Sequence, residues 1–422
     1  MTQSREEYLQ QIKRRENIVK ESYSWEDIRT TPEKAMKEVM ENLSISLTEI
    51  NKFPESQPKE FKPISCPIKL PKTLRDTIIG MILGQAVGDA VGLASEFFTT
   101  EQSTLIYNKQ HITYDTFVVD NHRAMWMNEN FVCQDWTDDT DQCLCLLDSI
   151  VYNNGECNIN DFAYRLKFWM FYGYPELGDL TGLDAGITTY KVLSNEHFTK
   201  DPFKVSEEVW NNSGQIVNGE ISRNAANGCV MRTSVGSIPY FWDEEKVVDN
   251  CRKWGMITHY DPRSRAAVIV TVLILAKLLQ GRMDVEKIIE EAIQRAEKEL
   301  NENDIKDMHK YVYAKEWEEL NLSHTKGYCW KPVGCAILTL KKAVEMKNKK
   351  MNDKQIFSDC LDNIVHQAGD ADTNGCVTGA CLGAYLKGIC IPDEWMELKH
   401  MNWLKERINR MLRLYELEPM EI

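Results

Sequence analysis

The chain has 422 residues and is acidic, with 50 lysines and arginines against 64 aspartates and glutamates and a formal net charge of −14. Its hydrophobic fraction of 43% and charged fraction of 27% are those of an ordinary globular protein. The acid excess argues against nucleic acid or an anionic membrane as a partner, so a phosphate-bearing substrate would need metal ions, helix N-termini or a few basic residues to bind.

The first 72 residues are expected to form an extension beside the main domain. Residues 1–47 are amphipathic and charged, which predicts helices divided at Pro32 and no signal peptide. Residues 52–72 carry five of the thirteen prolines among polar residues, which predicts an extended linker. We therefore expect a helical extension with a Pro-rich linker in residues 1–72 and the main domain in residues 73–422.

Helical patterns dominate from residue 73 onward. Apolar residues recur at three- and four-residue spacing in nine segments: residues 74–95, 142–152, 160–172, 263–279, 285–301, 332–346, 355–368, 373–388 and 391–415. Alternating β-branched runs are scarce, which predicts an all-α fold. The longest apolar run, residues 266–279, is shorter than the about 20 residues that span a bilayer and predicts a buried core helix.

Two of these helices carry glycines at every fourth position. The first has Gly80, Gly84, Gly88 and Gly92, and the second has Gly375, Gly379 and Gly383. An interior glycine costs about 0.5–1 kcal/mol relative to alanine, but spacing of four puts all of them on one helix face, where a second backbone can approach closely. Membrane packing is the alternative, and Asp89 within the first helix argues against it. We expect the two faces to pack together at the domain centre.

Five polar elements lie within or beyond the first glycine helix. Asp89 and Glu96 could be a buried packing acid and a solvated residue, or members of a site. Residues 136–141, Trp-Thr-Asp-Asp-Thr-Asp, directly precede an apolar helix. A helix cap needs only one such side chain, and three carboxylates within five residues repel each other unless a cation or solvent relieves them, so a metal site competes with the plain cap.

The next two elements are weaker signals. Residues 224–232 are rich in turn formers and could cradle an anion with backbone N–H groups, although a plain surface turn explains them equally well. His259 is one histidine of eight. The last element, residues 369–374, again precedes a helix and contains an Asp-x-Asp-Thr pattern. Ligands that are all hard oxygens suit Mg²⁺, with Mn²⁺ or Ca²⁺ also compatible, and disfavour zinc.

The thirteen cysteines form no C-x-x-C pair and no repeated spacing. Most lie in apolar, helix-like surroundings. Reduced and mostly buried thiols in a cytoplasmic protein are therefore expected.

Taken in order, these elements resemble the ADP-ribosylglycohydrolase family, of the dinitrogenase-reductase-activating glycohydrolase type. The family opening G-x-x-x-G-x-A-x-G-D-A-x-G matches residues 80–92, and W-T-D-D-T matches residues 136–140. N-G-x-x-M-R, T-H and G-D-x-D-T match residues 227–232, 258–259 and 369–373. The resemblance covers residues 73–415. It departs from the family pattern in the stretch 223–226, which is less glycine-rich than usual.

The resemblance implies an orthogonal helical bundle with a central dinuclear Mg²⁺ site, or Mn²⁺ in its place. By position, Thr137, Asp138 and Asp139 would bind one ion, Asp370 and Thr373 the other, and Asp372 would bridge them. Glu96 aligns with an acid that reaches the metal or gates the substrate, and it is a catalytic candidate together with Asp138, Asp139 and Asp372. The residues expected near ADP-ribose are Asn227, Gly228, Met231, Arg232 and His259.

The activity that the resemblance implies is metal-dependent hydrolysis of the glycosidic bond of an ADP-ribosyl conjugate. Removal of protein mono-ADP-ribosylation is the expected form, with an ADP-ribosylated protein or a small ADP-ribosyl conjugate as partner and a monomeric enzyme. Two alternatives stay open: a catalytically silent ADP-ribose-binding relative and a two-metal phosphohydrolase acting on a nucleotide diphosphate. The sequence does not decide which ADP-ribosyl linkage is attacked.

Overall fold

The computed structural model describes residues 54–55, 57–117, 134–179, 181–182, 184–217, 220–388 and 390–422. The helices predicted within residues 1–47 lie outside these ranges. The described part contains fourteen α-helices and one two-stranded hairpin, so the predicted all-α class is confirmed.

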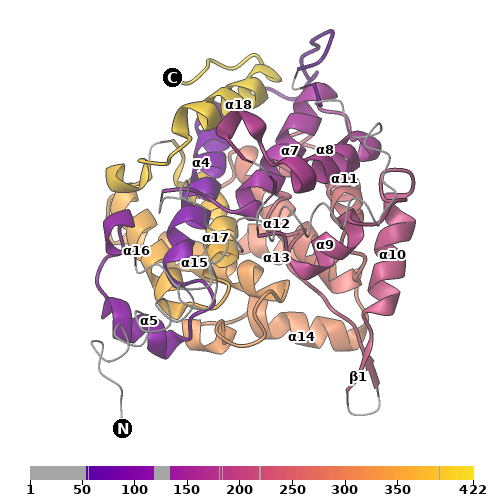
Figure 1. Cartoon of the computed structure of the whole chain (residues 1–422). Coiled ribbons are helices and arrows are strands. Elements are labelled where there is room, and N and C mark those ends of the chain that lie inside the picture. The colour runs from indigo at the N-terminus through magenta and orange to yellow at the C-terminus, as the bar shows by residue number, and fades with distance from the viewer. Residues whose placement is uncertain are drawn as a thin grey trace.

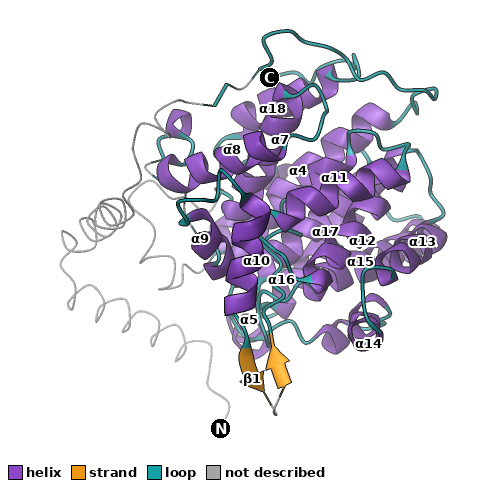
Figure 2. Ribbon diagram, turned by 90° about the vertical axis from the view of Figure 1, so that its right-hand side faces the viewer, coloured by secondary structure: helices purple, strands orange, loops and turns teal. Residues whose placement is uncertain are grey.

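The helices are distributed along the whole described chain (Figure 1). Their bounds are α4 (Leu74–Gly92), α5 (Thr100–Tyr107), α7 (Asp138–Tyr152), α8 (Ile159–Tyr172), α9 (Ile187–Leu193), α10 (Pro202–Asn212), α11 (Glu244–Met256), α12 (Pro262–Leu279), α13 (Val285–Glu297), α14 (Glu302–Val312), α15 (Trp330–Asn348), α16 (Asp353–Gln367), α17 (Ala371–Leu386) and α18 (Met401–Arg413). The hairpin pairs β1 (Gln215–Val217) with β2 (Glu220–Ser222) and projects away from the helices (Figure 2).

Helices α4 and α17 pack backbone against backbone at the centre of the molecule (Figure 1). A Cβ atom on Gly84 would lie 2.2 Å from the carbonyl oxygen of Gly379, and one on Gly379 would lie 2.0 Å from that of Gly84. The same exchange repeats between Gly88 and Gly375. Only glycine fits at this spacing, so the predicted packing of the two glycine faces is confirmed.

Helix α4 is also apolar enough to be mistaken for a membrane segment. Together with the short 3₁₀ turn η1 (Leu93–Ser95), it is the one described stretch with the length and composition to cross a bilayer. Its most apolar part is entirely buried inside the molecule. That burial fits the core helix of a globular domain. The apolar run 266–279, within α12, is likewise buried as predicted.

The C-terminal pattern is not the single helix predicted for residues 391–415. Helix α18 begins only at Met401, and a 3₁₀ turn, η6 (Asp393–Trp395), stands before it. The reason is local: Pro392 interrupts the pattern, and the indole of Trp395 is fully buried with Nε1 donating to the carbonyl of Ile112 at 2.9 Å. Burial of this tryptophan fixes an irregular path that periodicity does not reveal.

The Pro-rich segment is irregular in its described part, and it lies against the main domain. The backbone N–H of Ile64 donates to the carbonyl of Leu414 at 2.8 Å, and the guanidinium of Arg413 lies 4.0 Å from the ring centre of Phe61. The domain boundary at residue 72 stays a prediction.

The twelve described cysteines are all free thiols, and ten of them are buried, as expected.

Candidate metal centre and ligand pocket

The first acidic cluster lies at the N-terminus of α7. Thr137 is the N-cap residue, and its hydroxyl accepts from the backbone N–H of Asp139 at 3.4 Å. Asp138 and Asp139 follow in the first turn, both buried. The partial positive charge of a helix N-terminus favours carboxylates at these positions.

Asp89 of helix α4 holds this N-terminus in place. Its carboxylate accepts hydrogen bonds from the hydroxyl groups of Thr137 and Thr140, at 2.8 and 2.7 Å, and from the backbone N–H groups of both residues. Complete burial raises the pKa of Asp89 to about 6, and these four donors oppose that rise. Asp89 is thus a buried packing acid, one of its two sequence-based interpretations, and it packs directly under the acidic cluster.

The third carboxylate of the same motif points elsewhere. Asp141 accepts from the indole Nε1 groups of Trp136 at 2.8 Å and Trp169 at 2.9 Å. Its backbone carbonyl accepts from the hydroxyl of Tyr174. Asp141 therefore anchors α7 within the core, and two carboxylates of the motif remain for the centre.

The second cluster lies at the N-terminus of α17. Asp370 is the N-cap residue, and Asp372 and Thr373 stand in the first turn. Gly369 before them has φ +82°, and a Cβ there would lie 2.2 Å from the carbonyl oxygen of Leu322. Both the left-handed backbone and the close approach require glycine.

Glu96 reaches the second cluster through a short bridge. The neighbouring Phe97 donates its backbone N–H to the carbonyl of Gly369 at 2.5 Å, and Gly369 donates to the carbonyl of Phe98 at 3.1 Å. Carboxylate oxygens of Glu96, Asp370 and Asp372 come within 4.8 Å of one another, and all three residues are buried. The structure thus joins an acid after α4 to two acids that start α17.

The two clusters face each other because α4 contacts both helices. A Cβ on Gly92, at the end of α4, would lie 2.3 Å from the carbonyl oxygen of Ala371 at the start of α17. Asp89, three residues earlier, holds the start of α7. As a result Thr373 of the second cluster lies close enough to Asp139 of the first to oppose the rise in the pKa of that carboxyl.

The centre contains more negative charge than its surroundings neutralise. Burial raises the pKa values of Asp138 and Asp139 well above the ordinary value, and neighbouring carboxylates raise them further. The buried amine of Lys331 lies close enough to stabilise Asp370, but burial lowers its own pKa to about 8. Among the described residues, Oδ1 of Asp139 is buried without a hydrogen-bond donor. An all-oxygen donor set with an unmatched buried oxygen fits hard divalent cations.

The predicted ligand residues 227–232 divide into two groups. The Asn227 side-chain amide donates to Oδ2 of Asp370 at 2.7 Å, and Gly228 lies against the ring of His259. Met231 is buried, with its carbonyl accepting from Gln85, and Arg232 has no exposed surface. The Arg232 side chain therefore lies in the interior, and the expected contacts of these residues with a ligand stay predictions.

A pocket adjoins this turn. It is lined by apolar and polar residues including Thr188, Trp210, Asn224, Thr258, His259 and Tyr260. The guanidinium of Arg223 lies 4.6 Å from the centre of the Trp210 ring, and Trp210 Nε1 donates to Asp261 at 2.9 Å. An aromatic wall with polar groups around it is typical of small-molecule binding sites.

Asp184 is a residue that sequence reasoning missed. It is exposed in the loop before α9, with φ +65°. Its charge raises the pKa values of both Asp138 and Asp370, so it lies near both clusters. A single aspartate in a loop gives no local signal in the sequence. Only the fold, which brings the loop before α9 near the two clusters, identifies Asp184.

Two features define the class of this protein: an all-helical fold and a buried carboxylate centre formed by two helix N-termini. The family model for ADP-ribosylglycohydrolase matches residues 70–421. The chain therefore belongs to the ADP-ribosylglycohydrolase family.

Individual relatives are distant. An uncharacterized protein of Archaeoglobus fulgidus is 26% identical over 286 residues, which cover 67% of this chain and 81% of the relative. A protein of Acanthamoeba polyphaga mimivirus, provisionally described as an ADP-ribosyl glycohydrolase, is 23% identical over 279 residues, or 62% and 74% of the two chains. A solved chain from an ADP-ribosylglycohydrolase-related protein complex matches with a TM-score of 0.56 at 23% identity, covering 82% of this chain and 99% of its own. At that identity the structural match concerns the fold.

Proposed function

We propose that this protein hydrolyses the glycosidic bond of an ADP-ribosyl conjugate and releases ADP-ribose, as an enzyme of the dinitrogenase-reductase-activating glycohydrolase type. Family membership supports a glycosidase-type hydrolase that acts on ADP-ribose conjugates. The observation that carries the proposal is the convergence of buried carboxylates from α7, α17 and the segment after α4. The proposed partner is an ADP-ribosylated protein or a small conjugate, and the proposed state is a cytoplasmic monomer.

We propose two Mg²⁺ ions as cofactors, with Mn²⁺ as a substitute. Thr137, Asp138 and Asp139 would hold one ion, Asp370 and Thr373 the other, and Asp372 would serve both. The oxygen-only donors and the unmatched buried oxygen of Asp139 support this assignment. Such ions would act as Lewis acids and lower the pKa of a bound water.

The carboxylates of the chain suit the charge that develops during the reaction. Hydrolysis at an anomeric carbon passes through an oxocarbenium-like transition state, which is positively charged. Glu96, whose carboxylate lies close to those of Asp370 and Asp372, is the proposed acceptor of the proton from the attacking water. Asp184 is a second carboxylate near the two clusters, and the Asn227 amide is oriented by Asp370.

The pocket beside Gly228 and His259 is the proposed site for the nucleotide end of ADP-ribose. Trp210 supplies an aromatic face and Arg223 a positive charge against it, in a protein whose overall charge is negative. Stacking with an aromatic ring contributes about 1–3 kcal/mol per base in proteins that bind single-stranded nucleic acids.

Product analysis tests this proposal. The full chain is incubated with Mg²⁺ and with arginine-linked, serine-linked and O-acetyl-linked ADP-ribose, and products are separated by liquid chromatography. We expect free ADP-ribose from at least one conjugate. Release of AMP would instead show pyrophosphate cleavage, and tight binding of ADP-ribose without any product would show a silent binding protein. Either outcome refutes the proposed reaction.

A further inference from the structure

Arg232 is a buried cation whose partners are neutral. The residue has no exposed surface, and its guanidinium donates to the side-chain oxygen of Gln142 at 2.9 Å, to the hydroxyl of Thr258 and to the carbonyl of Trp254 at 3.5 Å. Removing a charge from water without an opposite charge in direct contact is costly: the charge of Asp138 partly offsets this cost, but burial still lowers the pKa of Arg232 to about 10. A cation kept at this position therefore calls for a reason beyond packing.

One arm of the guanidinium leads to the ligand pocket. A guanidinium only donates, so the Thr258 oxygen accepts from Arg232. A hydroxyl oxygen can accept twice, but the buried hydroxyl proton needs an acceptor of its own, and among the described residues Nδ1 of His259, 2.8 Å away, is the acceptor beside it. Burial and the nearby charge of Arg232 lower the pKa of His259 well below its ordinary value, so the ring is neutral. A neutral ring that accepts at Nδ1 carries its proton on Nε2.

The Nε2 edge of His259 faces the glycine turn of the pocket. A Cβ on Gly228 would lie 2.9 Å from Cε1 and 3.0 Å from Nε2 of this ring. Thr258 and His259 both line the pocket itself. The Thr258 hydroxyl, to which Arg232 donates, thus favours a donor rather than an acceptor at this edge of the ring.

The other arm leads to the acidic centre. Because Arg232 can only donate, the Gln142 amide must turn its oxygen to the guanidinium. Its NH₂ group then donates to Oδ2 of Asp138, at 2.6 Å. The guanidinium thereby supplies the first acidic cluster with a hydrogen-bond donor through Gln142.

We propose that Arg232 is a positioning residue that fixes His259 as its Nε2–H tautomer at the pocket and holds the Gln142 amide against Asp138. One buried guanidinium thus orients a donor at the ligand site and a carboxylate at the candidate metal centre. The use of the His259 donor by ADP-ribose rests on the proposed function, whereas the tautomer and the amide orientation do not.

The tautomer can be measured directly in the full chain. Histidine labelled with ¹⁵N gives distinct Nδ1 and Nε2 signals for each tautomer, and His259→Gln identifies the signals of His259. We expect Nε2–H in the wild type and in Thr258→Ser, which keeps the hydroxyl. Thr258→Val has the same shape without the hydroxyl, and we expect it to shift His259 toward Nδ1–H. Nδ1–H in the wild type, or an unchanged tautomer in Thr258→Val, would overturn the inference.

Binding measurements separate this inference from the proposed function. Thr258→Val should lower the affinity for ADP-ribose about tenfold, which is the loss typical of one hydrogen bond, and Thr258→Ser should restore it. Titration calorimetry measures both affinities. If the tautomer shifts and ADP-ribose affinity does not, the tautomer assignment stands and the proposed ligand site is wrong.

The contact through Gln142 has a separate test. Arg232→Lys cannot donate to both Gln142 and Thr258 in the same geometry, so it should lower the affinity for Mn²⁺ about tenfold, as measured by electron paramagnetic resonance. Unchanged Mn²⁺ affinity would refute the inference that Arg232 orients Asp138 through Gln142.

Discussion

Single residues decide the chemistry of the acidic centre. Asp139 is the clearest example, because the features that suit it to a functional site also destabilise the metal-free fold. Its carboxylate is buried beside Asp89 and Asp370, and burial and these charges raise its pKa well above the ordinary value. The same carboxylate has an oxygen without a hydrogen-bond donor among the described residues. A group that destabilises the metal-free fold in this way is typical of a functional site.

Asp139→Asn should therefore separate stability from function. We expect the metal-free variant to melt no lower than the wild type, because one buried like charge is removed. Mg²⁺ should no longer raise its melting temperature, and turnover should fall by about 100-fold or more, as losses at metal sites commonly do. Thermal melts with and without Mg²⁺ test this, with the exposed Asp115→Asn as control. A variant that keeps its Mg²⁺ shift would rule out Asp139 as a ligand.

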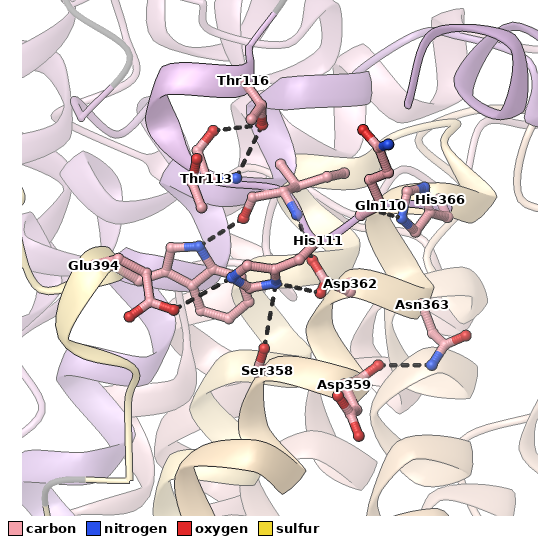
Figure 3. A network of polar contacts seen from close by, with 12 residues as sticks. Gln110, His111, Thr113, Thr116, Ser358, Asp359, Asp362, Asn363, His366 and Glu394 are labelled. Carbon is pink, nitrogen blue, oxygen red and sulfur yellow. Dashed lines mark hydrogen bonds and ion pairs between the residues drawn. The ribbon is translucent and has the colours of Figure 1, made fainter. Parts of the chain in front are cut away.

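A network of polar contacts around two histidines lies beside α16 (Figure 3). His111 Nδ1 lies 2.6 Å from Asp362, and Nε2 lies 3.3 Å from Glu394. Burial alone would lower the pKa of His111, but these two carboxylates outweigh it and raise the pKa. The nearby His366 donates from Nε2 to the carbonyl of Gln110, and burial lowers its pKa.

Stability from protonated His111 should be lost on the alkaline side. A raised folded pKa means that the contribution is complete below the unfolded value of about 6.5 and disappears as pH rises through the folded pKa. We expect His111→Gln to lower the melting temperature at pH 6 and to have less effect at pH 8.5. The exposed His197→Gln is the control. An equal effect of His111→Gln at both pH values would contradict the protonated network.

At this scale, the sequence correctly predicted that each of the two acidic motifs stands at a helix start, because each motif lies on one short segment. Residues 137–139 and 370–373 each stand at a helix start, so their shared direction follows from local structure. The roles of Asp89, Asp184 and Arg232 depend on which helices contact one another, and no spacing in the sequence predicts those contacts. Arg232 was therefore expected at the ligand although its side chain lies in the core.

At the scale of elements, long apolar helices were predictable and short polar ones were not. The segments predicted at 332–346 and 355–368 correspond to α15 and α16 within two residues at each end. Helices α5, α9, α10, α11 and α14 and the β1–β2 hairpin were not predicted. Short helices of mixed composition are stabilised by packing rather than by their own pattern.

The α4–α17 contact makes a sharp prediction for glycine substitutions. Gly84→Leu places a side chain where the Gly379 carbonyl oxygen lies 2.2 Å from a Cβ, so we expect a loss at or above the roughly 1–3 kcal/mol typical of overpacking. Because α17 carries the second acidic cluster, Mg²⁺ affinity should fall as well. Gly186→Ala is the matched control, since a Cβ there meets nothing within 4 Å. If Gly84→Leu melts like the wild type, the two helices do not pack as described.

At the scale of the whole molecule, the Pro-rich segment can be tested by truncation. Removing residues 1–72 should leave a folded domain that still binds Mg²⁺. Its melting temperature should be lower than that of a truncation of residues 1–60, because Phe61 and Ile64 would be missing from the surface near Leu414. Circular dichroism melts of the two proteins give the comparison. An unfolded 73–422 protein would place the Pro-rich segment within the domain.

The order in which the centre can form follows from the same central pair. Helix α7 begins at Asp138 and α17 at Ala371, roughly 230 residues later, and α4 precedes both. During synthesis, α4 leaves the ribosome long before its partner exists, with its glycine face uncovered. Closing so long a loop makes folding slow and leaves partly folded chains prone to aggregation. In refolding experiments, Mg²⁺ should therefore bind only in the last kinetic phase, when the C-terminal helices join the N-terminal ones.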